Sequence, residues 1–387
     1  MDRLRNVPWD ALRAEVALPA IASVLQGVAA EREVDRALRR HRMLAREERT
    51  ATVEAIFGVA LWRRRLLWHT GSASPAGLLA SLLRDLGGVP EERALALTGA
   101  SLAPARIGPP ARLADRWSLP DWLEAHLLRE LGEAAEAFCA AIAIPGPVCL
   151  RANRLLCTRS ELASSLAREG IDTVPAGRAP NALVVRTPQA NLFGTRTWRQ
   201  GHFEPQDEGS QLVGHLVGAR PDETVLDLCA GAGGKSLLLA AEGARVLAYD
   251  VDRERLERLR TRARRAGADR RIEIIDRPRP AERVLVDAPC SELGVMRRGP
   301  DARWRIDPRS LTELPRLQLQ LLENAAPLAA KRLVYATCTV NRAENEDVAD
   351  AFDRAHPELQ RVATWRTLPH LDGTDGFFAA VWERPGA

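Results

Sequence analysis

The chain has 387 residues, a length that favours two or three domains over one. Hydrophobic residues make up 46% and charged residues 27% of the chain, which is the balance of an ordinary globular protein. No apolar run approaches the roughly 18 residues that a membrane span needs, and the first residues show no secretory signal. We therefore expect a cytoplasmic protein without a membrane partner.

The basic residues are almost all arginine. Only Lys235 and Lys331 of the 55 basic residues are lysine, and the formal net charge is +4. A GC-rich coding bias explains most of this preference. Arginine also binds phosphate and stacks on bases through its planar guanidinium group, so the composition is compatible with an RNA partner.

The first two parts of the chain differ in their hydrophobic pattern. Residues 1–140 carry apolar side chains at three- and four-residue intervals between proline and glycine breaks, which predicts a helical domain. Residues 148–205 predict a small α+β subdomain, with strands at Cys149–Asn153 and Ala182–Arg186 and an amphipathic helix at Ser160–Glu169.

Residues 206–387 alternate short apolar runs with helical segments. Repeated βα units predict an α/β domain, with a Rossmann-like parallel sheet covered by helices on both faces. The short, proline-containing link from Asp276 to Val284 leaves no room for a helix. The expected strands are Val225–Cys229, Arg245–Asp250, Ile272–Asp276, Val284–Ala288 and Leu333–Thr337.

A glycine-rich turn follows the first of these strands in the run VLDLCAGAGGKS. Glycines at 231, 233 and 234 let the backbone approach a ligand, and the next helix directs its N-terminus to the same place. Asp250 ends the second strand, where a carboxylate can accept hydrogen bonds from both ribose hydroxyls. Asp276 ends the third strand and is expected at the adenine edge. Because NAD favours GxGxxG and this turn is GxGG, we expect S-adenosylmethionine.

Two cysteines are candidates for chemistry. None of the six cysteines forms a CxxC pair, so we expect neither a metal site nor a disulfide framework. Cys290 and Cys338 each follow a strand end, and such ends share one crevice in a doubly wound sheet. Buried cysteines are usually inert, but these two adjoin the expected cofactor. A thiolate that attacks carbon-6 of a pyrimidine activates carbon-5 for methylation, and Lys235 would favour the thiolate.

Several ordered motifs resemble the RNA (cytosine-5) methyltransferases of the Sun/NOP group. The helical start is similar to the NusB-like domain of the bacterial ribosomal-RNA members. The matching segments are SLPDWL, LRANRL, PQDEGSQLV, VLDLCAGAGGK, DAPCSELGVMRRGPDARW, YATCTVNRAENE and DGTDGFF, from Ser118 to the C-terminal part.

The resemblance implies a role for each matching residue. Cys338 takes the place of the nucleophile, and Cys290 that of the cysteine that releases the product. Asp287 matches the acid that contacts the target cytosine, and Lys235 of the glycine turn is expected as a further catalytic residue. The implied S-adenosylmethionine contacts are Cys229, Ala230, Gly231, Ala232, Gly233, Gly234, Lys235, Asp250, Asp276 and Asp287.

The chain departs from the family pattern beside one cysteine. Glu292 stands where the family has a small residue, and we expect its carboxylate to oppose thiolate formation at Cys290. Gly231 and Ala232 replace the usual Ala-Pro of the glycine turn. Every residue with a chemical role is present, so we expect an active enzyme.

The implied substrate is an unpaired or flipped cytosine in RNA. The NusB-like start favours 16S ribosomal RNA, and transfer RNA is the alternative. A non-catalytic RNA-binding assembly factor and a nicotinamide oxidoreductase are rival classes, which the intact cysteine motifs and the glycine spacing disfavour. We expect a monomer.

Overall fold

The computed structural model describes residues 2–102, 106, 108–188 and 190–386. These residues form two compact units. The first contains the residues up to Pro145 together with Met296–Pro308, and the second contains Gly146–Val295 and the residues from Arg309 onward. No described residue before Cys149 lies in a β-strand, as the sequence predicts.

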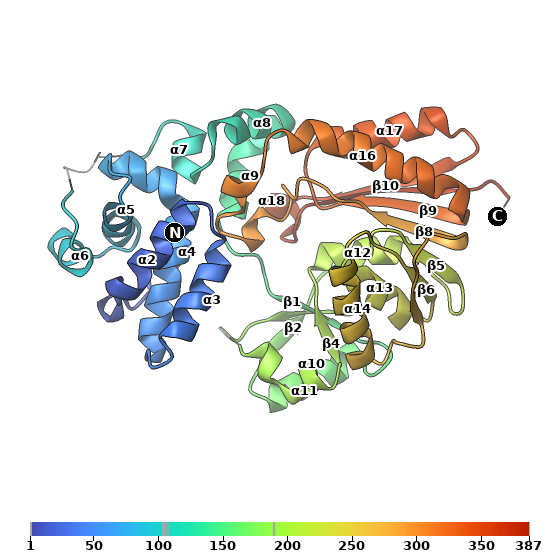
Figure 1. The fold of residues 1–387 in the computed structure, drawn as a ribbon, viewed down its shortest axis with the longest axis horizontal. Coiled ribbons are helices and arrows are strands. Elements are labelled where there is room, and N and C mark those ends of the chain that lie inside the picture. The colour runs from blue at the N-terminus through green and yellow to red at the C-terminus, as the bar shows by residue number, and fades with distance from the viewer. Residues whose placement is uncertain (1, 103–105, 107, 189, 387) are drawn as a thin grey trace. The chain divides into compact units, whose positions relative to one another are not determined.

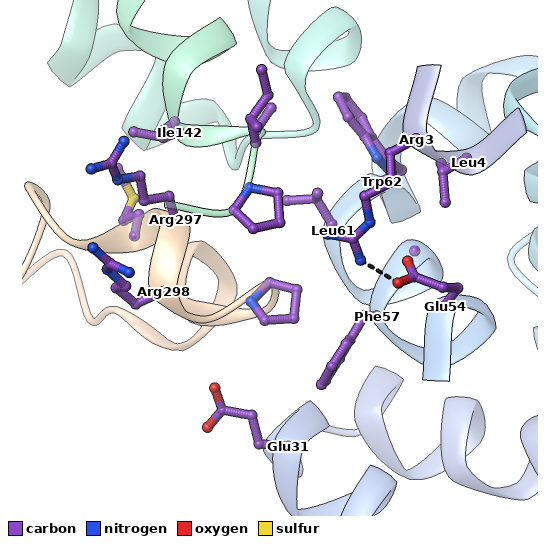
Figure 2. A pocket seen from close by; sticks show the side chains of 16 residues that line it. Arg3, Leu4, Glu31, Glu54, Phe57, Leu61, Trp62, Ile142, Arg297 and Arg298 are labelled. Atoms are coloured by element: carbon purple, nitrogen blue, oxygen red, sulfur yellow. Dashed lines mark hydrogen bonds and ion pairs between the residues drawn. The ribbon is translucent and has the colours of Figure 1, made fainter. Parts of the chain in front are cut away.

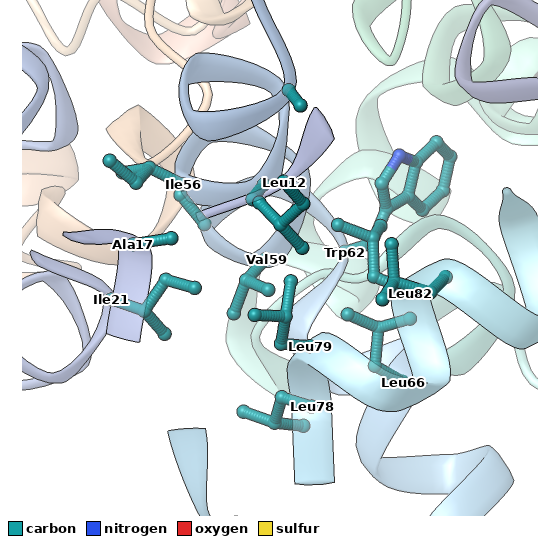
Figure 3. Close-up of a cluster of buried hydrophobic side chains, with 14 of the residues drawn as sticks. Leu12, Ala17, Ile21, Ile56, Val59, Trp62, Leu66, Leu78, Leu79 and Leu82 are labelled. Atoms are coloured by element: carbon teal, nitrogen blue, oxygen red, sulfur yellow. The ribbon is translucent and has the colours of Figure 1, made fainter. Parts of the chain in front are cut away.

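The first unit packs around helix α4 (Arg46–Thr70). Its buried Ile56, Val59, Trp62 and Leu66 recur every three or four residues and therefore share one face. That face forms a core with leucines of α5 and the following π-helix (Figure 3). The other helices are α1 (Asp2–Arg5), α2 (Ala14–Leu25), α3 (Ala30–Arg40), α5 (Pro75–Ser81), the π-helix (Leu82–Leu86), α6 (Glu91–Thr98), α7 (Leu113–Trp117), α8 (Asp121–Leu131) and α9 (Ala135–Ile142).

A later segment, Met296–Pro308, also belongs to the first unit. It contains the short helix α15 (Ala302–Arg305). The fully buried Arg303 donates hydrogen bonds to the carbonyl oxygens of Trp117 (2.9 Å) and Ile142 (3.1 Å). The hydrophobic pattern of the sequence does not separate this segment from the catalytic range 206–387, because its role depends on contacts distant in sequence.

The α+β subdomain has a four-stranded antiparallel sheet in the order β2-β3-β1-β4. The predicted strands are confirmed as β1 (Cys149–Ala152) and β3 (Ala182–Val185), and the predicted helix as α10 (Arg159–Arg168). The remaining elements are β2 (Thr173–Pro175), α11 (Arg196–Arg199) and β4 (Phe203–Pro205).

The large sheet has seven strands in the order β10-β11-β9-β8-β5-β6-β7. The five predicted strands are confirmed and pair in parallel. No helix separates β7 from β8, as the sequence predicts. The strands are β5 (Thr224–Asp227), β6 (Arg245–Ala248), β7 (Ile272–Ile274), β8 (Ala281–Asp287), β9 (Ala329–Thr337), β10 (Gln360–Thr367) and β11 (Phe377–Glu383).

The antiparallel strands β10 and β11 were not predicted. β11 is almost entirely buried, so it shows no alternation of apolar and polar residues. β10 lies at the sheet edge and is largely exposed, so it shows no apolar face. Neither strand carries the period-two pattern by which strands are recognised in a sequence.

Helices cover both faces of the large sheet (Figure 1). Successive strand residues alternate between two cores: Val225 packs with α12–α14, whereas Leu226 packs with α16 and α17. None of the helices in the described part of the chain is long and apolar enough to cross a membrane. The covering helices are α12 (Glu208–Leu216), α13 (Gly234–Ala241), α14 (Arg253–Arg265), α16 (Ser310–Ala325) and α17 (Glu346–Ala355); α18 (Pro369–Asp372) precedes β11.

Candidate active site

The direction of the strand order reverses between β5 and β8. From β5 the chain proceeds outward through β6 and β7, and then returns to form β8 and β9 on the other side. Ligands of open α/β sheets bind at the carboxyl ends of the strands at such a reversal. The glycine turn follows β5, and Pro289–Ser291 follows β8, so the sheet topology brings both predicted motifs to one crevice.

The glycine turn connects β5 to α13. It contains the predicted residues from Cys229 to Gly234. Gly233 has φ +85°, where other residues are strained, and a Cβ atom there would lie 2.0 Å from Leu259 Cδ1, so a substitution would also displace that side chain. Gly233 is also the N-cap of α13, whose first N–H groups therefore face the crevice. The turn leaves room for a ligand close to the backbone.

The two predicted acids on the outer strands lie in different environments. Asp250 follows β6 and is buried; its carboxylate accepts the N–H groups of Gly231 and Asp252, both at 2.8 Å. Each carboxylate oxygen has a second lone pair, so hydroxyl groups of a ribose can still bind. Asp276 follows β7; its side chain is 90% exposed and pairs with Arg253 at 2.9 Å.

One acid at the glycine turn was not predicted as a site residue. Asp227 ends β5, is fully buried, and accepts a hydrogen bond from Ser236 Oγ at 2.6 Å. Its other carboxylate oxygen has no hydrogen-bond partner. Burial raises the pKa of Asp227 to about 7; the Ser236 hydrogen bond and Lys235 oppose this shift, whereas Asp287 and Asp250 add to it. A cationic ligand group would satisfy both the free oxygen and the buried charge.

Arg151 of β1 supports the glycine turn from the α+β subdomain. It is buried and donates to the Gly234 carbonyl oxygen at 2.8 Å and to Gln206 Oε1. Desolvation lowers its pKa to about 10, which leaves the guanidinium group charged at neutral pH. The LRANRL motif contained this residue, but nothing in its spacing indicated the contact.

The structure brings the two predicted cysteines together. Cys290 Sγ and Cys338 Sγ are 3.3 Å apart, and the Cys338 N–H group donates to Cys290 Sγ at the same distance. Both side chains are partly exposed. Cys229 is also partly exposed, and burial together with Asp227, Asp287 and Asp250 raises its pKa. Cys290 and Cys338 are distinguished by their contact with each other.

Several charged groups surround Cys338. Lys235 donates to Asp287 Oδ2 at 2.6 Å, and this pairing raises the pKa of Lys235 against the effect of desolvation. The pKa of Cys338 is raised well above its usual value by the hydrogen bond with Cys290, by desolvation and by the charges of Cys290, Glu292 and Asp287. Asp287 shares the charge of Lys235, and the predicted help of Lys235 to the Cys338 thiolate stays a prediction.

The DGTDGFF motif, which leads into β11, is hydrogen-bonded to the loop after β8. Gly376 N–H donates to the Gly294 carbonyl oxygen at 2.9 Å, and Gly294 N–H donates to that of Cys338 at 3.0 Å. The Lys235 ammonium group lies 5.6 Å from the centre of the Phe377 ring, within cation–π range. The loops after β8 and β9 and the start of β11 thus form one hydrogen-bonded group.

The first unit contains a separate apolar pocket of about 280 Å³ (Figure 2). Phe57, Leu61 and Trp62 of α4 line one side, and Met296–Pro300 contributes to the other. An ion pair between Arg3 and Glu54 lies at its edge. None of the predicted catalytic or cofactor residues lines this pocket, so it is distinct from the crevice that holds the cysteines.

The strand order, the glycine turn and the acid after β6 define a Rossmann-like, S-adenosylmethionine-dependent methyltransferase. Residues 215–383 match the family described as 16S rRNA methyltransferase RsmB/F, and residues 119–191 match its ferredoxin-like domain. The chain belongs to this RsmB/F family of RNA methyltransferases, which confirms the predicted enzyme class, fold and cofactor.

Relatives and a solved structure agree with this assignment. The probable ribosomal RNA small subunit methyltransferase B of Bacillus subtilis is 34% identical over 352 residues, covering 82% of this chain and 75% of that protein. The ribosomal RNA small subunit methyltransferase B of Thermus thermophilus is 33% identical over 419 residues, which cover 95% of this chain and 97% of that protein. The crystal structure of PH0851 has a TM-score of 0.78 at 22% identity, over 98% of this chain and 99% of that one, which shows a shared fold.

Proposed function

We propose that this protein methylates carbon-5 of a cytosine in 16S ribosomal RNA, with Cys338 as the nucleophile. The observation that carries the proposal is the 3.3 Å approach of Cys290 and Cys338 at the ends of neighbouring strands. In this arrangement one thiol can add to carbon-6 of the cytosine, and the other can remove the proton from carbon-5. The names of the relatives in Bacillus subtilis and Thermus thermophilus favour ribosomal RNA as the substrate.

The residues of the glycine turn suit S-adenosylmethionine. The free carboxylate oxygen of Asp227 suits the methionine ammonium group, Asp250 the ribose hydroxyls, and Asp276 the adenine edge. The backbone from Cys229 to Gly234 would line the space between them. S-adenosylmethionine supplies an electrophilic methyl group on a sulfonium sulfur.

The first chemical task of the chain is to activate the cytosine. Cys338, as a thiolate, forms a bond to carbon-6, and the electron pair of the 5,6 double bond moves toward the ring nitrogen N3. Asp287 is placed to accept a hydrogen bond from the cytosine amino group. Lys235 holds the Asp287 carboxylate in position through their 2.6 Å ion pair. Carbon-5 thereby becomes nucleophilic toward the methyl group.

The second task is to release the product. After methylation, carbon-5 carries both a methyl group and a hydrogen. Cys290, as a thiolate, takes this proton; the bond between Cys338 and carbon-6 breaks, and the 5,6 double bond re-forms. One proton leaves carbon-5 for each methyl group gained, so the reaction balances.

The other parts of the chain would bind the RNA. We assign RNA binding to the helical domain 1–140 and to the α+β subdomain 148–205, and methyl transfer to 206–387. The family acts on RNA. A cytoplasmic location and a monomeric state remain expectations from the sequence.

The proposal is tested with 16S ribosomal RNA transcripts, transfer RNA transcripts and isotopically methyl-labelled S-adenosylmethionine. Nucleosides are analysed by mass spectrometry after digestion, and the Cys338→Ala variant is the matched control. We expect labelled 5-methylcytidine in 16S RNA with the wild-type protein and none with the variant, whose cofactor affinity stays unchanged.

Other outcomes reject defined parts of the proposal. If only the transfer RNA is labelled, transfer RNA and not 16S ribosomal RNA is the substrate. Cofactor binding without labelled RNA of either kind would indicate a non-catalytic assembly factor. Undiminished turnover in Cys338→Ala would remove Cys338 as the nucleophile.

A further inference from the structure

The tail of the YATCTVNRAENE motif contributes a fully buried carboxylate behind the two cysteines. Glu344 lies in a 3₁₀ turn (Arg342–Glu344) and is 0% exposed. It accepts hydrogen bonds from Ser291 N–H (2.9 Å) and Ser291 Oγ (2.5 Å). It also accepts from Asn341 Nδ2 and Gln318 Nε2, both at 2.9 Å. Four donors from three side chains and one backbone group therefore converge on it.

The network around Glu344 reaches both sides of Cys290. Ser291, the next residue, donates twice to the carboxylate. Gln318 Nε2 bonds Glu344 and also donates to the Pro289 carbonyl oxygen at 2.9 Å. The residues immediately before and after Cys290 are thus fixed by groups that meet at one carboxylate.

The same network reaches the loop of Cys338. The Ser291 and Thr339 hydroxyl oxygens are 2.8 Å apart, which links the residues that follow the two cysteines. Asn345, next to Glu344, accepts from Thr337 Oγ1 (2.5 Å) and donates to the Thr339 carbonyl oxygen (3.1 Å). Each cysteine is therefore held by its two chain neighbours.

A buried carboxylate is costly unless its hydrogen bonds are complete. Here four hydrogen bonds offset the desolvation cost of the Glu344 carboxylate. They also connect the loops that carry Cys290 and Cys338 rigidly to each other. A loss of even one angstrom in the placement of a reacting group can reduce a rate on the order of 100-fold. Nothing in the binding of the cofactor requires this carboxylate.

We propose that Glu344 is a positioning residue that holds Cys290 against Cys338 for the release of methylated RNA. This inference rests on the proposed function and adds a residue to its release step. Glu344 acts through Ser291 and Gln318 and does not touch the substrate. Its loss would therefore impair the step that needs Cys290 more than the attack by Cys338.

The test compares Glu344→Gln with Glu346→Gln, the other acid of the ENE sequence, which pairs with Arg366 outside the network. Glutamine keeps the shape of Glu344 but turns an amide NH₂ group toward donors. We expect kcat to fall on the order of 100-fold, with KM for RNA and cofactor affinity unchanged. A covalent protein–RNA adduct should accumulate on denaturing gels, and Glu346→Gln should behave like the wild type.

A double-mutant comparison tests whether Glu344 acts through Cys290. In the Cys290→Ala background, Glu344→Gln should change the rate of adduct formation by less than about twofold. Wild-type kinetics in Glu344→Gln, a fall in the rate of adduct formation in the Cys290→Ala background as large as the fall of kcat, or the same loss in Glu346→Gln would overturn the inference.

Ser291→Ala decides the question if Glu344→Gln does not fold, because it leaves the carboxylate paired with Asn341 and Gln318. It should accumulate adduct with unchanged KM, and wild-type kinetics in this variant would reject the positioning role. If the wild-type protein forms neither adduct nor 5-methylcytidine, the proposed function itself has failed, which is a different result.

Discussion

Glu292 is the residue at which the active site departs from its family pattern. It is exposed, lies directly after Ser291, and has φ +59°, a conformation that few non-glycine residues adopt. Its carboxylate helps to raise the pKa of Cys338, after the effects of Cys290 and desolvation. The structure adds an effect of Glu292 on Cys338; the predicted effect on Cys290 stays a prediction.

The first prediction concerns the pH dependence of methyl transfer. Activity should rise with pH as Cys338 ionises, and Glu292→Gln removes a negative charge that holds its pKa high. The rising limb of kcat against pH should therefore move to lower pH by about 0.5 unit. Glu257→Gln, on the exposed surface of α14, is the charge-matched control. Superimposable profiles for the wild type and Glu292→Gln would contradict this electrostatic account.

The candidate cysteines were easier to recognise in the sequence than the charges around them. Cys290 and Cys338 were recognisable because each follows an apolar run that ends in a turn. The 2.6 Å pairing of Lys235 with Asp287 was not, since it joins the start of α13 to the end of β8, and the two residues are 52 positions apart in the sequence. Asp227 was missed for a related reason: its unpartnered oxygen exists only in the folded chain.

At the scale of elements, three loops meet where β8, β9 and β11 approach each other. A Cβ atom on Gly294 would lie 2.1 Å from the Gly376 carbonyl oxygen and 2.9 Å from that of Cys338. These are backbone atoms, which cannot move aside as a flexible side chain can. The close approach of the loops therefore requires glycine at position 294.

The second prediction follows from this contact. Gly294→Ala should separate the loops, lower kcat on the order of 100-fold, and cost about 1–3 kcal/mol of stability. Cofactor affinity should stay within about twofold of the wild type, because the glycine turn is unaffected. Gly177→Ala is the control, since its Cβ meets nothing within 4 Å. Full activity in Gly294→Ala would show that the loops are not held by this contact.

The elements that the sequence revealed belong to a repeated pattern of short apolar runs and amphipathic helices. The parallel strands β5, β6 and β8 and the helix α10 follow this pattern, and their positions agree with the prediction to within a few residues. β10 and β11 depart from it, because β10 is mostly exposed and only the short helix α18 separates the two strands. The pairing of β11 with β9 and of β10 with β11 depends on the completed sheet and not on local sequence.

At the scale of the whole molecule, Asp227 makes the stability of the fold depend on pH. Its folded pKa is about 7, raised from 3.8 by burial. Between these values the folded chain binds more protons than the unfolded chain at this site. Its contribution to stability is therefore complete below about pH 4, falls as pH rises toward 7, and is lost above that.

The third prediction uses this linkage. Asp227→Asn cannot ionise, so its unfolding free energy at pH 8 should exceed that of the wild type by on the order of 4 kcal/mol, with a smaller difference at pH 5. Urea unfolding at both pH values measures this, with the exposed Asp276→Asn as control. The same Asp227 variant should bind S-adenosylmethionine more weakly. Parallel pH profiles in the wild type and Asp227→Asn would contradict the raised pKa.

Met296–Pro308 belongs to the helical unit, which the hydrophobic pattern of the sequence does not predict. This segment continues the motif that contains Cys290, yet Arg303 anchors it to carbonyl oxygens at Trp117 and Ile142. A motif is continuous in sequence, whereas the packing of its residues is decided by the whole fold. The chemistry of the chain was therefore predictable, and the division between its units was not.

The most direct test of the account is to trap the covalent intermediate. Cys290→Ala protein is incubated with S-adenosylmethionine and 16S ribosomal RNA, separated on a denaturing gel, and the cross-linked peptide is identified by mass spectrometry. The account predicts a stable adduct between Cys338 and the methylated cytosine, absent in the Cys290→Ala/Cys338→Ala double variant. An adduct on any other residue, or none from a Cys290→Ala protein that binds both the cofactor and the RNA, would contradict it.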